Sequence, residues 1–416
     1  MNPNIAANQQ RLFLEFLGEL RPHLGRDSSL PRRIKEIFAR NRSIGSRDRK
    51  LYRELVYTAL RFLPWIEPWL DRDPPLAAKI TAWLAPELKP TSVYRATHCG
   101  DWPPVPERLA DKAETLAALL SAGREPLPES HFDPQSLLPA WFRDHCPKAF
   151  ESPHLDALNS RANVWVRIQC NERSLVFDEF HARGWAYATS PDFPDAISLP
   201  PNAEVATSDA YRRGFVEIQD LGSQMVLAHA AILPGQRWLD ACAGAGGKTL
   251  QLARVLGAQG HVDATDIRVE ILDELADRAK RARLDNISIV RAAADAYDGV
   301  LVDAPCSGSG TWRRQPHLKW YVKPETIASF TATQLQILTA NAKPVRPGGL
   351  LVYATCSLSH CENADLAAEF LRSHPEFKPE LPPKNFGGEF DGIGTSLLPG
   401  THDTDGFYVA TLRRNP

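Results

Sequence analysis

The second half of the chain alternates between two kinds of segment. From Gln219 onward, short apolar runs are followed by amphipathic helical patterns, and glycine-rich loops stand between them. This alternation is typical of a parallel β-sheet, because parallel neighbours must be joined by a long crossover, usually a helix. Residues 216–416 are therefore predicted to form an α/β domain, and ligands of such a sheet bind beyond the carboxyl ends of its strands.

One glycine-rich loop in this region has the features of a cofactor site. The segment RWLDACAGAGGKTLQLARVLG takes a short apolar strand into a loop with Gly244, Gly246 and Gly247, which then opens a helix. Glycine lets the backbone approach a ligand closely, and a helix N-terminus offers N–H groups to an anion. The next apolar strand ends in Asp266, which is suited to bind both ribose hydroxyls or to cap the following helix. A nucleotide-like cofactor is expected here, although an ordinary tight turn can give a similar loop.

Two cysteines follow two further strands. Asp303 and Cys306 come just after the apolar run VLVD, and Cys356 comes just after LLVYAT. A lone cysteine in such a chain is usually an inert buried residue. Two thiols at strand ends beside a cofactor loop point instead to chemistry, whereas Cys99, Cys146, Cys170 and Cys361 have no such context.

This set of side chains suits covalent catalysis on a pyrimidine. Carbon 5 of cytosine is a weak nucleophile, but a thiolate that adds to carbon 6 turns the ring into an enamine that can accept a methyl group. Asp303 is expected to act at ring nitrogen 3 as a general acid, and a second thiol can serve the release stage. A dinucleotide dehydrogenase would share the glycine loop but has no use for two thiols.

The first part of the chain reads differently. Residues 9–125 carry apolar side chains at helical spacing, which predicts several helices separated by proline-rich joints. A small α+β module is expected over 131–215. A basic run within the helices could meet phosphates or could be a solvated helix face. A second candidate RNA surface is Trp312, Arg313, Arg314, Lys319 and Trp320, which could also be a packed loop. The basic run contains Arg21, Arg26, Arg32, Arg33, Lys35, Arg40, Arg42, Arg47, Arg49, Lys50 and Arg53, against Asp27, Glu36 and Asp48.

Together these motifs resemble the Sun-type family of RNA cytosine-5 methyltransferases, and within it the RsmB-like branch that acts on small-subunit (16S) ribosomal RNA. The resemblance covers about residues 136–414 and rests on EIQDLGSQ, DACAGAGGKT, DAPCSGSGTWRRQPHLKW, ATCSLSHCEN and DGFYVATLRR. The N-terminal helices resemble a NusB-like RNA-binding domain more weakly, through IGSRDRKLYRELVYTALRF. Two departures are that Gly244 and Ala245 replace a more usual alanine-proline pair, and that His317 stands where aspartate is common.

The resemblance implies a role for each matching residue. It makes Cys356 the nucleophile and Cys306 the residue of release, with Asp303 between cofactor and base and Lys248 beside them. It implies S-adenosylmethionine as the cofactor, with Asp266 on its ribose and Asp295 as a third acidic ligand. The segment that would wrap the methionine end of the cofactor is Cys242, Ala243, Gly244, Ala245, Gly246, Gly247 and Lys248.

The predicted architecture is thus α/β, a Rossmann-like S-adenosylmethionine methyltransferase sheet at 216–416, after a NusB-like helical domain at 1–130 and an α+β RNA-binding module at 131–215. RNA is the expected partner. We expect a cytoplasmic monomer without a metal or a membrane span, since no signal segment, long apolar stretch or CxxC pair is present. The competing hypothesis is a non-catalytic RNA-binding or ribosome-assembly scaffold that retains the cofactor pocket.

Overall fold

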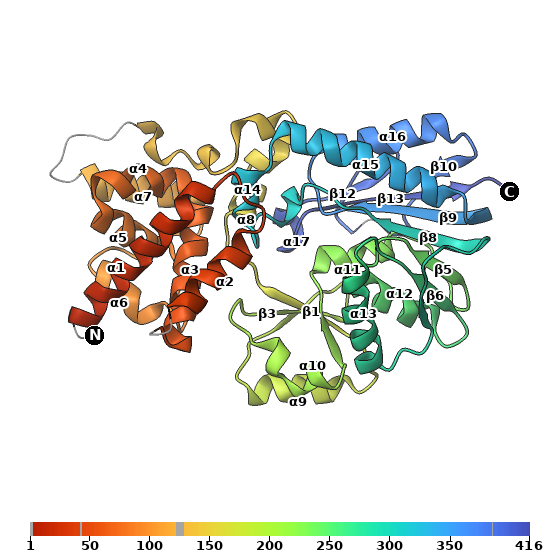
Figure 1. The fold of residues 1–416 in the computed structure, drawn as a ribbon, viewed down its shortest axis with the longest axis horizontal. Coiled ribbons are helices and arrows are strands. Elements are labelled where there is room, and N and C mark those ends of the chain that lie inside the picture. Colours follow the sequence, from red (N-terminus) through yellow and green to blue (C-terminus); the bar gives the residue numbers. More distant parts are fainter. Residues whose placement is uncertain (1–2, 42–43, 122–128, 385) are drawn as a thin grey trace. The chain divides into compact units, whose positions relative to one another are not determined.

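The chain forms two compact units in a computed structural model that describes residues 3–41, 44–121, 129–384 and 386–416 (Figure 1). One unit comprises residues 1–161 and 312–323, and the other comprises residues 162–311 and 324–416. The predicted 131–215 module is divided between them, so its boundaries stay a prediction. No helix among the described residues has the length and apolar character needed to cross a membrane.

The first unit is helical, as expected for residues 9–125, of which 42–43 and 122–125 lie outside the described residues. Phe16 lies at its centre, with ring centroids 5.4 Å from Phe38 and 5.2 Å from Tyr52, and all three side chains are buried. Such aromatic pairs tie helices that are distant in sequence into one core. The helices are α1 (Pro3–Leu20), α2 (Leu30–Arg40), α3 (Ser46–Arg61), α4 (Leu63–Arg72), α5 (Pro74–Leu84), α6 (Ser92–Cys99), α7 (Leu109–Ser121), α8 (His154–Leu158) and α14 (Leu318–Tyr321), with 3-10 turns η1 (Arg21–His23), η2 (Glu129–Phe132), η3 (Pro134–Leu137), η4 (Ala140–Arg143) and η5 (Pro147–Phe150).

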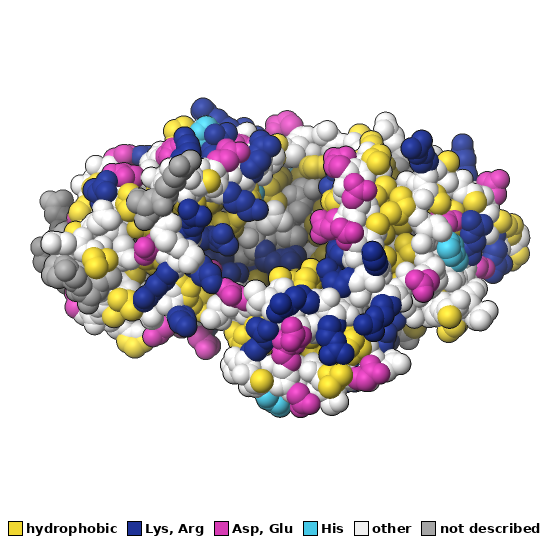
Figure 2. All heavy atoms as spheres, turned by 60° about the horizontal axis from the view of Figure 1, so that its bottom comes forward, with side chains coloured by type: hydrophobic (Ala, Val, Ile, Leu, Met, Phe, Trp, Pro, Cys, Tyr) yellow, Lys and Arg dark blue, Asp and Glu magenta, His cyan; other side chains and the backbone are white. Residues whose placement is uncertain are grey.

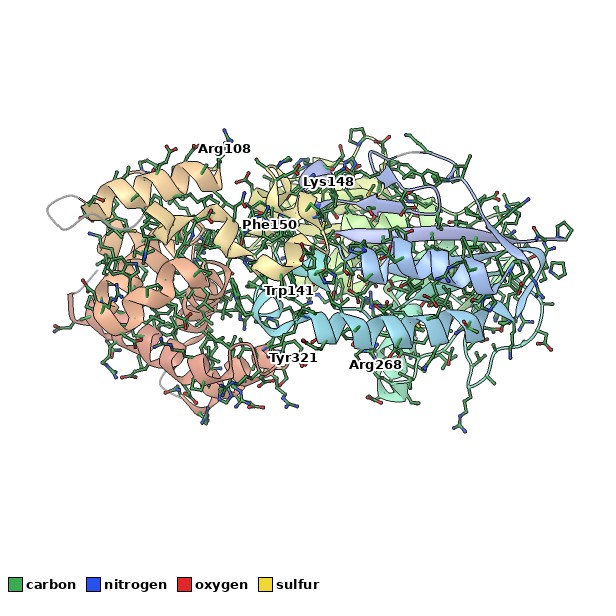
Figure 3. The ribbon with its side chains drawn as sticks, turned by 90° about the horizontal axis from the view of Figure 1, so that it is seen from above. Arg108, Trp141, Lys148, Phe150, Arg268 and Tyr321 are labelled. Atoms are coloured by element: carbon green, nitrogen blue, oxygen red, sulfur yellow. The ribbon has the colours of Figure 1, made fainter. Side chains whose placement is uncertain are left out.

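The segment 312–323 packs inside this unit rather than on its surface. The Trp312 ring is fully buried and lies 4.6 Å from the ring of Phe142. Phe142 in turn packs at right angles to Trp141, which is labelled in Figure 3. Lys319 is also fully buried, and its ammonium donates to the carbonyls of Arg61 and Leu137 and to the side chain of Asn159 at 2.7–3.0 Å.

The expected RNA surface at Trp312–Trp320 is therefore wrong for its buried members Trp312, Arg313 and Lys319. The aromatic body of Trp312 fills core space, and neutral oxygens satisfy the donors of Lys319. Burial lowers the pKa of Lys319 well below its ordinary value, because desolvation disfavours a charge, and the positive charge of Arg61 acts in the same direction.

The second unit contains a small antiparallel sheet. Its strands are β1 (Val164–Ile168), β2 (Ala188–Thr189), β3 (Ala196–Leu199) and β4 (Val216–Ile218), in the order β2-β3-β1-β4. Val166, Ile168, Ile197 and Val216 form its core with Phe180 of α9 (Arg173–Ala182). The turn η6 (Val205–Thr207) and helix α10 (Asp209–Arg212) follow β3.

A larger sheet with mixed strand direction forms the rest of this unit, in the order β11-β12-β13-β9-β8-β5-β6-β7 with β10 beside β13. Strands β5 to β9 run parallel, as predicted, and the C-terminal strands add an antiparallel edge. The strands are β5 (Arg237–Asp240), β6 (His261–Ala264), β7 (Ile287–Ile289), β8 (Tyr297–Asp303), β9 (Val345–Thr355), β10 (Phe377–Pro379), β11 (Glu389–Phe390), β12 (Thr395–Leu397) and β13 (Phe407–Arg414).

Helices cover both faces of this sheet. Each face carries its own apolar cluster, which the helices bury. One cluster contains Trp238 and Leu252, and the other contains Tyr297, Leu338 and Phe370. The result is a Rossmann-like α/β fold whose parallel strands end at one edge (Figure 1). The covering elements are α11 (Leu221–Ala228), α12 (Gly247–Leu256), α13 (Val269–Ala282), α15 (Pro324–Ala342), α16 (Ala364–Ser373) and α17 (Pro399–His402), with turns η7 (Ser309–Thr311) and η8 (His360–Glu362).

Candidate active site

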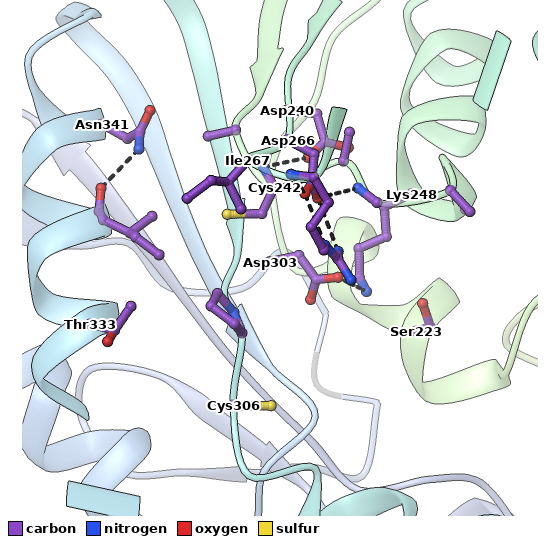
Figure 4. A pocket seen from close by; sticks show the side chains of 18 of the residues that line it. Ser223, Asp240, Cys242, Lys248, Asp266, Ile267, Asp303, Cys306, Thr333 and Asn341 are labelled. Carbon is purple, nitrogen blue, oxygen red and sulfur yellow. Dashed lines mark hydrogen bonds and ion pairs between the residues drawn. The ribbon is translucent and has the colours of Figure 1, made fainter. Parts of the chain in front are cut away.

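A cavity of about 790 Å³ lies at the carboxyl ends of β5, β6 and β8 (Figure 4). Nearly all the residues predicted to bind a cofactor line it: Cys242, Ala243, Gly244, Ala245, Gly247, Lys248, Asp266 and Asp303. Cys306 lines it as well, whereas Gly246 is buried within the loop and is not among the lining residues. Asp295 is exposed and is not among the lining residues, so its role stays a prediction.

Glycine is required in the loop between β5 and α12. Gly244 and Gly246 have φ values of 50° and 89°, which glycine adopts readily and other residues rarely do. A Cβ at Gly246 would also lie 2.7 Å from the side chain of Leu275 and 2.9 Å from that of Leu250. The loop therefore packs tightly on α13 while its outer side stays open to the cavity.

Lys248 and Asp303 form an ion pair in the wall of the cavity (Figure 4). Lys248 lies in the first turn of α12, and its Nζ is 2.8 Å from Oδ2 of Asp303 at the end of β8. The Lys248 side chain is largely buried, while that of Asp303 is about one-third exposed. A cation and the free N–H groups of a helix start thus lie at one end of the cavity, where they can bind a carboxylate.

Asp266 lies on the other side of the loop. Its carboxylate accepts a hydrogen bond from the Gly244 N–H at 2.8 Å, and Nε and Nη2 of Arg268 approach it at 3.1 Å. Burial would raise the pKa of Asp266, but these hydrogen bonds outweigh it and hold the pKa below its usual value. Arg268 was missed at the sequence level, and its guanidinium occupies oxygens that a ribose diol would need.

Asp240 at the end of β5 is a second residue that the sequence did not single out. Its side chain is almost fully buried and accepts a 2.7 Å hydrogen bond from Thr249. Burial raises its pKa to about 7, and the nearby negative charge of Asp303 acts in the same direction. One wall of the cavity also comes from α15, through Phe330, Thr333, Ile337 and Asn341, which carry no recognisable motif.

The two predicted catalytic thiols lie side by side. Strands β8 and β9 are parallel neighbours, and the cysteines that follow them approach to 3.3 Å between their sulfur atoms. The hydrogen bond with Cys356 raises the pKa of Cys306 well above its ordinary value, and burial and the charges of Cys356 and Glu362 add to this. Either thiol could donate in this contact, and the raised pKa of Cys306 favours its protonated form.

Comparison with known proteins identifies the sequence family of this chain. The family model described as 16S rRNA methyltransferase RsmB/F matches residues 228–413. The ribosomal RNA small subunit methyltransferase B of Vibrio vulnificus (strain YJ016) is 29% identical over 89% of this chain and 92% of its own length. That of Salmonella paratyphi C (strain RKS4594) is 31% identical over 67% of each protein.

Solved structures share the fold. The crystal structure of PH0851 superposes with a TM-score of 0.71 at 22% identity, over 98% of each chain. That of NSun6 from Pyrococcus horikoshii with SFG has a TM-score of 0.59 at 19% identity, covering 66% of this chain and 97% of that one.

The fold is Rossmann-like, and the cavity lies where such a fold binds its ligand. The matched family makes the protein a methyltransferase, and S-adenosylmethionine is its cofactor. The sequence relatives are specific enough to narrow this class. The chain belongs to the RsmB/F family of 16S rRNA methyltransferases.

Proposed function

We propose that the enzyme methylates carbon 5 of a cytosine in small-subunit ribosomal RNA through a covalent adduct with Cys356. The observation that carries the proposal is the pair of sulfur atoms 3.3 Å apart beside the cofactor cavity. The relatives named ribosomal RNA small subunit methyltransferase B support this choice of RNA. A substrate in the ribosome would place the enzyme in the cytoplasm. Family membership does not favour a non-catalytic scaffold.

The donor set fits the cofactor. Lys248 and the start of α12 would hold its carboxylate, Asp266 would hold its ribose, and the apolar side of α15 around Phe330 and Ile337 would cover it. When bound, S-adenosylmethionine supplies an electrophilic methyl group on a sulfonium. Arg268 has to give up its contacts with Asp266 before both oxygens of that carboxylate are available.

The first chemical stage belongs to Cys356 and Asp303. The Cys356 thiolate adds to carbon 6 of the base, which forms a C–S bond and pushes electron density towards ring nitrogen 3 and carbon 5. Asp303 lies next to the Lys248 ammonium and can pass a proton from it to nitrogen 3. Carbon 5 then carries the electron pair that takes the methyl group.

The second stage belongs to Cys306. The hydrogen bond with Cys356 and the charge of Cys356 both raise the pKa of Cys306, and both are lost once Cys356 is bonded to the base. Cys306 can then give its proton to solvent in the cavity and, as a thiolate, remove the hydrogen from carbon 5, while nitrogen 3 returns its proton to the pair of Asp303 and Lys248. The electron pair of that C–H bond reforms the ring double bond, the C–S bond breaks, and Cys356 leaves as a thiolate.

The helical unit is the proposed RNA-binding part. Arg26, Arg32, Lys35, Arg40, Arg47 and Arg53 are exposed on or beside α2 and α3, whereas Arg42 lies outside the described residues. Some of the run is paired, for example Arg33 with Asp27. Figure 2 shows basic side chains interspersed with acidic ones over the face it presents. Such mixed charge is consistent with phosphate contacts that are local rather than spread over the whole surface.

Separate alanine variants of the two thiols test the proposal. Cys356→Ala should lose methylation and form no RNA adduct, because nothing remains to activate carbon 5. Cys306→Ala should keep the attack but lose the release, so that a denaturant-resistant protein–RNA band accumulates when RNA and S-adenosylmethionine are both supplied. Cys170→Ala removes a partly buried thiol of the small sheet and is the matched control.

Methylated RNA is mapped by bisulfite sequencing, and the adduct is seen on a denaturing gel. A trapped band in Cys356→Ala with none in Cys306→Ala would reverse the two roles. Absence of any band from both variants would contradict covalent catalysis altogether.

A further inference from the structure

A buried glutamate lies beneath both cysteine loops. Ser307 directly follows Cys306 and Ser357 directly follows Cys356, and the hydroxyls of both serines donate to the carboxylate of Glu362. We propose that Glu362 is a positioning residue that holds the two thiols at one fixed separation, so that release can follow methyl transfer. This inference rests on the proposed function.

Four donors converge on the Glu362 carboxylate. Oε1 accepts from the backbone N–H of Ser307 at 2.8 Å and from Nε2 of Gln334 at 3.0 Å. Oε2 accepts from the hydroxyls of Ser307 at 2.5 Å and of Ser357 at 2.6 Å. Glu362 itself is fully buried. A buried carboxylate is costly unless it is hydrogen-bonded, so this cluster holds together only while both loops supply their donors.

Further hydrogen bonds fix the backbone of each loop. Gln334 donates to the carbonyl of Pro305 at 2.8 Å, on the residue before Cys306. The N–H of Gly310 donates to the carbonyl of Cys356 at 2.9 Å, and the hydroxyls of Ser309 and Ser357 are hydrogen-bonded at 3.1 Å. The loop that follows β8 and the loop that follows β9 thus behave as one rigid body around Glu362.

The two chemical stages depend on this rigidity to different degrees. Addition to carbon 6 uses one thiol, and that thiol can adjust to the base. Release needs Cys306 at carbon 5 while Cys356 is already bonded to carbon 6, so both sulfurs must be placed on one ring. The 3.3 Å separation seen here is the distance that Glu362 maintains. The charge of Glu362 also helps to raise the pKa of Cys306.

The expected effect of Glu362→Ala is a selective loss of release. A displacement of about 1 Å can slow a step by about 100-fold, so turnover should fall by one to two orders of magnitude. Covalent protein–RNA adduct should accumulate, as in Cys306→Ala, because the addition step survives. Glu362→Gln preserves the shape, and the serine hydroxyls can turn to accept from its amide. This variant should release its product and show little adduct.

Tyr353→Phe is the matched control. The Tyr353 hydroxyl is buried in the same cluster and donates to the backbone carbonyl of Glu362 at 2.6 Å, but its hydrogen bonds reach neither serine. Its loss should leave the adduct at the wild-type level. Binding of S-adenosylmethionine by calorimetry checks that each full-length variant is folded. If Glu362→Ala fails that check, the Ser307→Ala/Ser357→Ala double variant carries the same test, because it removes both hydroxyl donors and leaves the carboxylate with its two N–H donors.

The adduct is quantified on a denaturing gel for wild type, Cys306→Ala and the Glu362 variants with the same RNA. A trapped band in Cys306→Ala but wild-type levels in a folded Glu362→Ala would overturn the inference and leave the proposed function standing. Equal trapping in Glu362→Gln and Glu362→Ala would also overturn it, because the effect would then come from charge rather than position. No band in Cys306→Ala would contradict the proposed function itself.

Discussion

Replacing Asp240 with asparagine should make the enzyme more stable, and the gain should depend on pH. Asp240 is 1% exposed, and its pKa of about 7 lies far above the ordinary value of 3.8. A carboxyl with a raised pKa in the folded state supports folding fully only below its unfolded pKa. That support is lost as the pH rises from about 4 to about 7, because the unfolded chain releases its proton first.

The magnitude follows from the two pKa values. Between them the folded state loses about 1.4 kcal/mol per pH unit, which amounts to about 1 kcal/mol at pH 4.5 and about 4 kcal/mol at pH 7.5. Asparagine removes this penalty and keeps one oxygen for the 2.7 Å hydrogen bond from Thr249. The asparagine NH2 group would replace the oxygen that accepts the 3.4 Å hydrogen bond from the N–H of Cys242. Two donors would then face each other, which costs about 1 kcal/mol at either pH. Asp240→Asn should therefore gain about 3 kcal/mol at pH 7.5 and almost nothing at pH 4.5.

Urea unfolding of the cofactor-free protein at the two pH values measures this difference. Asp298→Asn is the matched control, because Asp298 lies in the same sheet and accepts hydrogen bonds of 2.7 Å from Arg346 and from the backbone of Arg237. It should lose stability and gain nothing at the higher pH. A gain for Asp240→Asn that is equal at pH 4.5 and pH 7.5 would refute the reasoning, since it would show that Asp240 does not titrate between them.

Two further predictions concern the helical unit. Lys319→Met should lower the free energy of unfolding by about 2–4 kcal/mol in urea, because three buried oxygens lose their donor. An unchanged urea midpoint would show that burying the charge costs as much as its hydrogen bonds contribute. The double variant Arg47→Gln/Arg53→Gln should weaken RNA binding, and the slope of log binding constant against log salt should become shallower by about 0.7 per lost phosphate contact. Arg372→Gln on α16 is the control and should leave this slope unchanged. Equal slopes for the double variant and the wild type would show that α3 is only a solvated face.

The sequence was sufficient to predict the parts of the site that follow local rules. The parallel sheet, the glycine loop and the positions of the thiols after two strands all come from patterns within about twenty residues. Strands β8 and β9 are neighbours in the sheet, and this adjacency brings Cys306 and Cys356 together as expected. The chemical roles of these residues stay predictions until the variants are measured.

Residues that act through tertiary contacts could not be predicted in this way. The pairing of Arg268 with Asp266, the wall that α15 contributes and the convergence of two loops on Glu362 depend on how elements pack. The segment around Lys319 was misjudged for a related reason. Its charge and aromatic content suit a nucleic-acid surface, but only the folded structure shows that neutral oxygens surround the Lys319 ammonium.

The late position of residues 312–323 in the chain affects how the protein is made. An N-terminal domain usually folds while the ribosome is still adding residues behind it. Here the helical unit lacks Trp312 and Lys319 until residue 323 of 416 has been added. At 5–20 residues per second, the wait after residue 161 is roughly 10–30 s, during which the unit exposes the space that the Trp312 ring will fill. The helical unit therefore completes its core only after residue 323 has been added, and a product truncated before residue 312 would leave the site of the Trp312 ring unfilled.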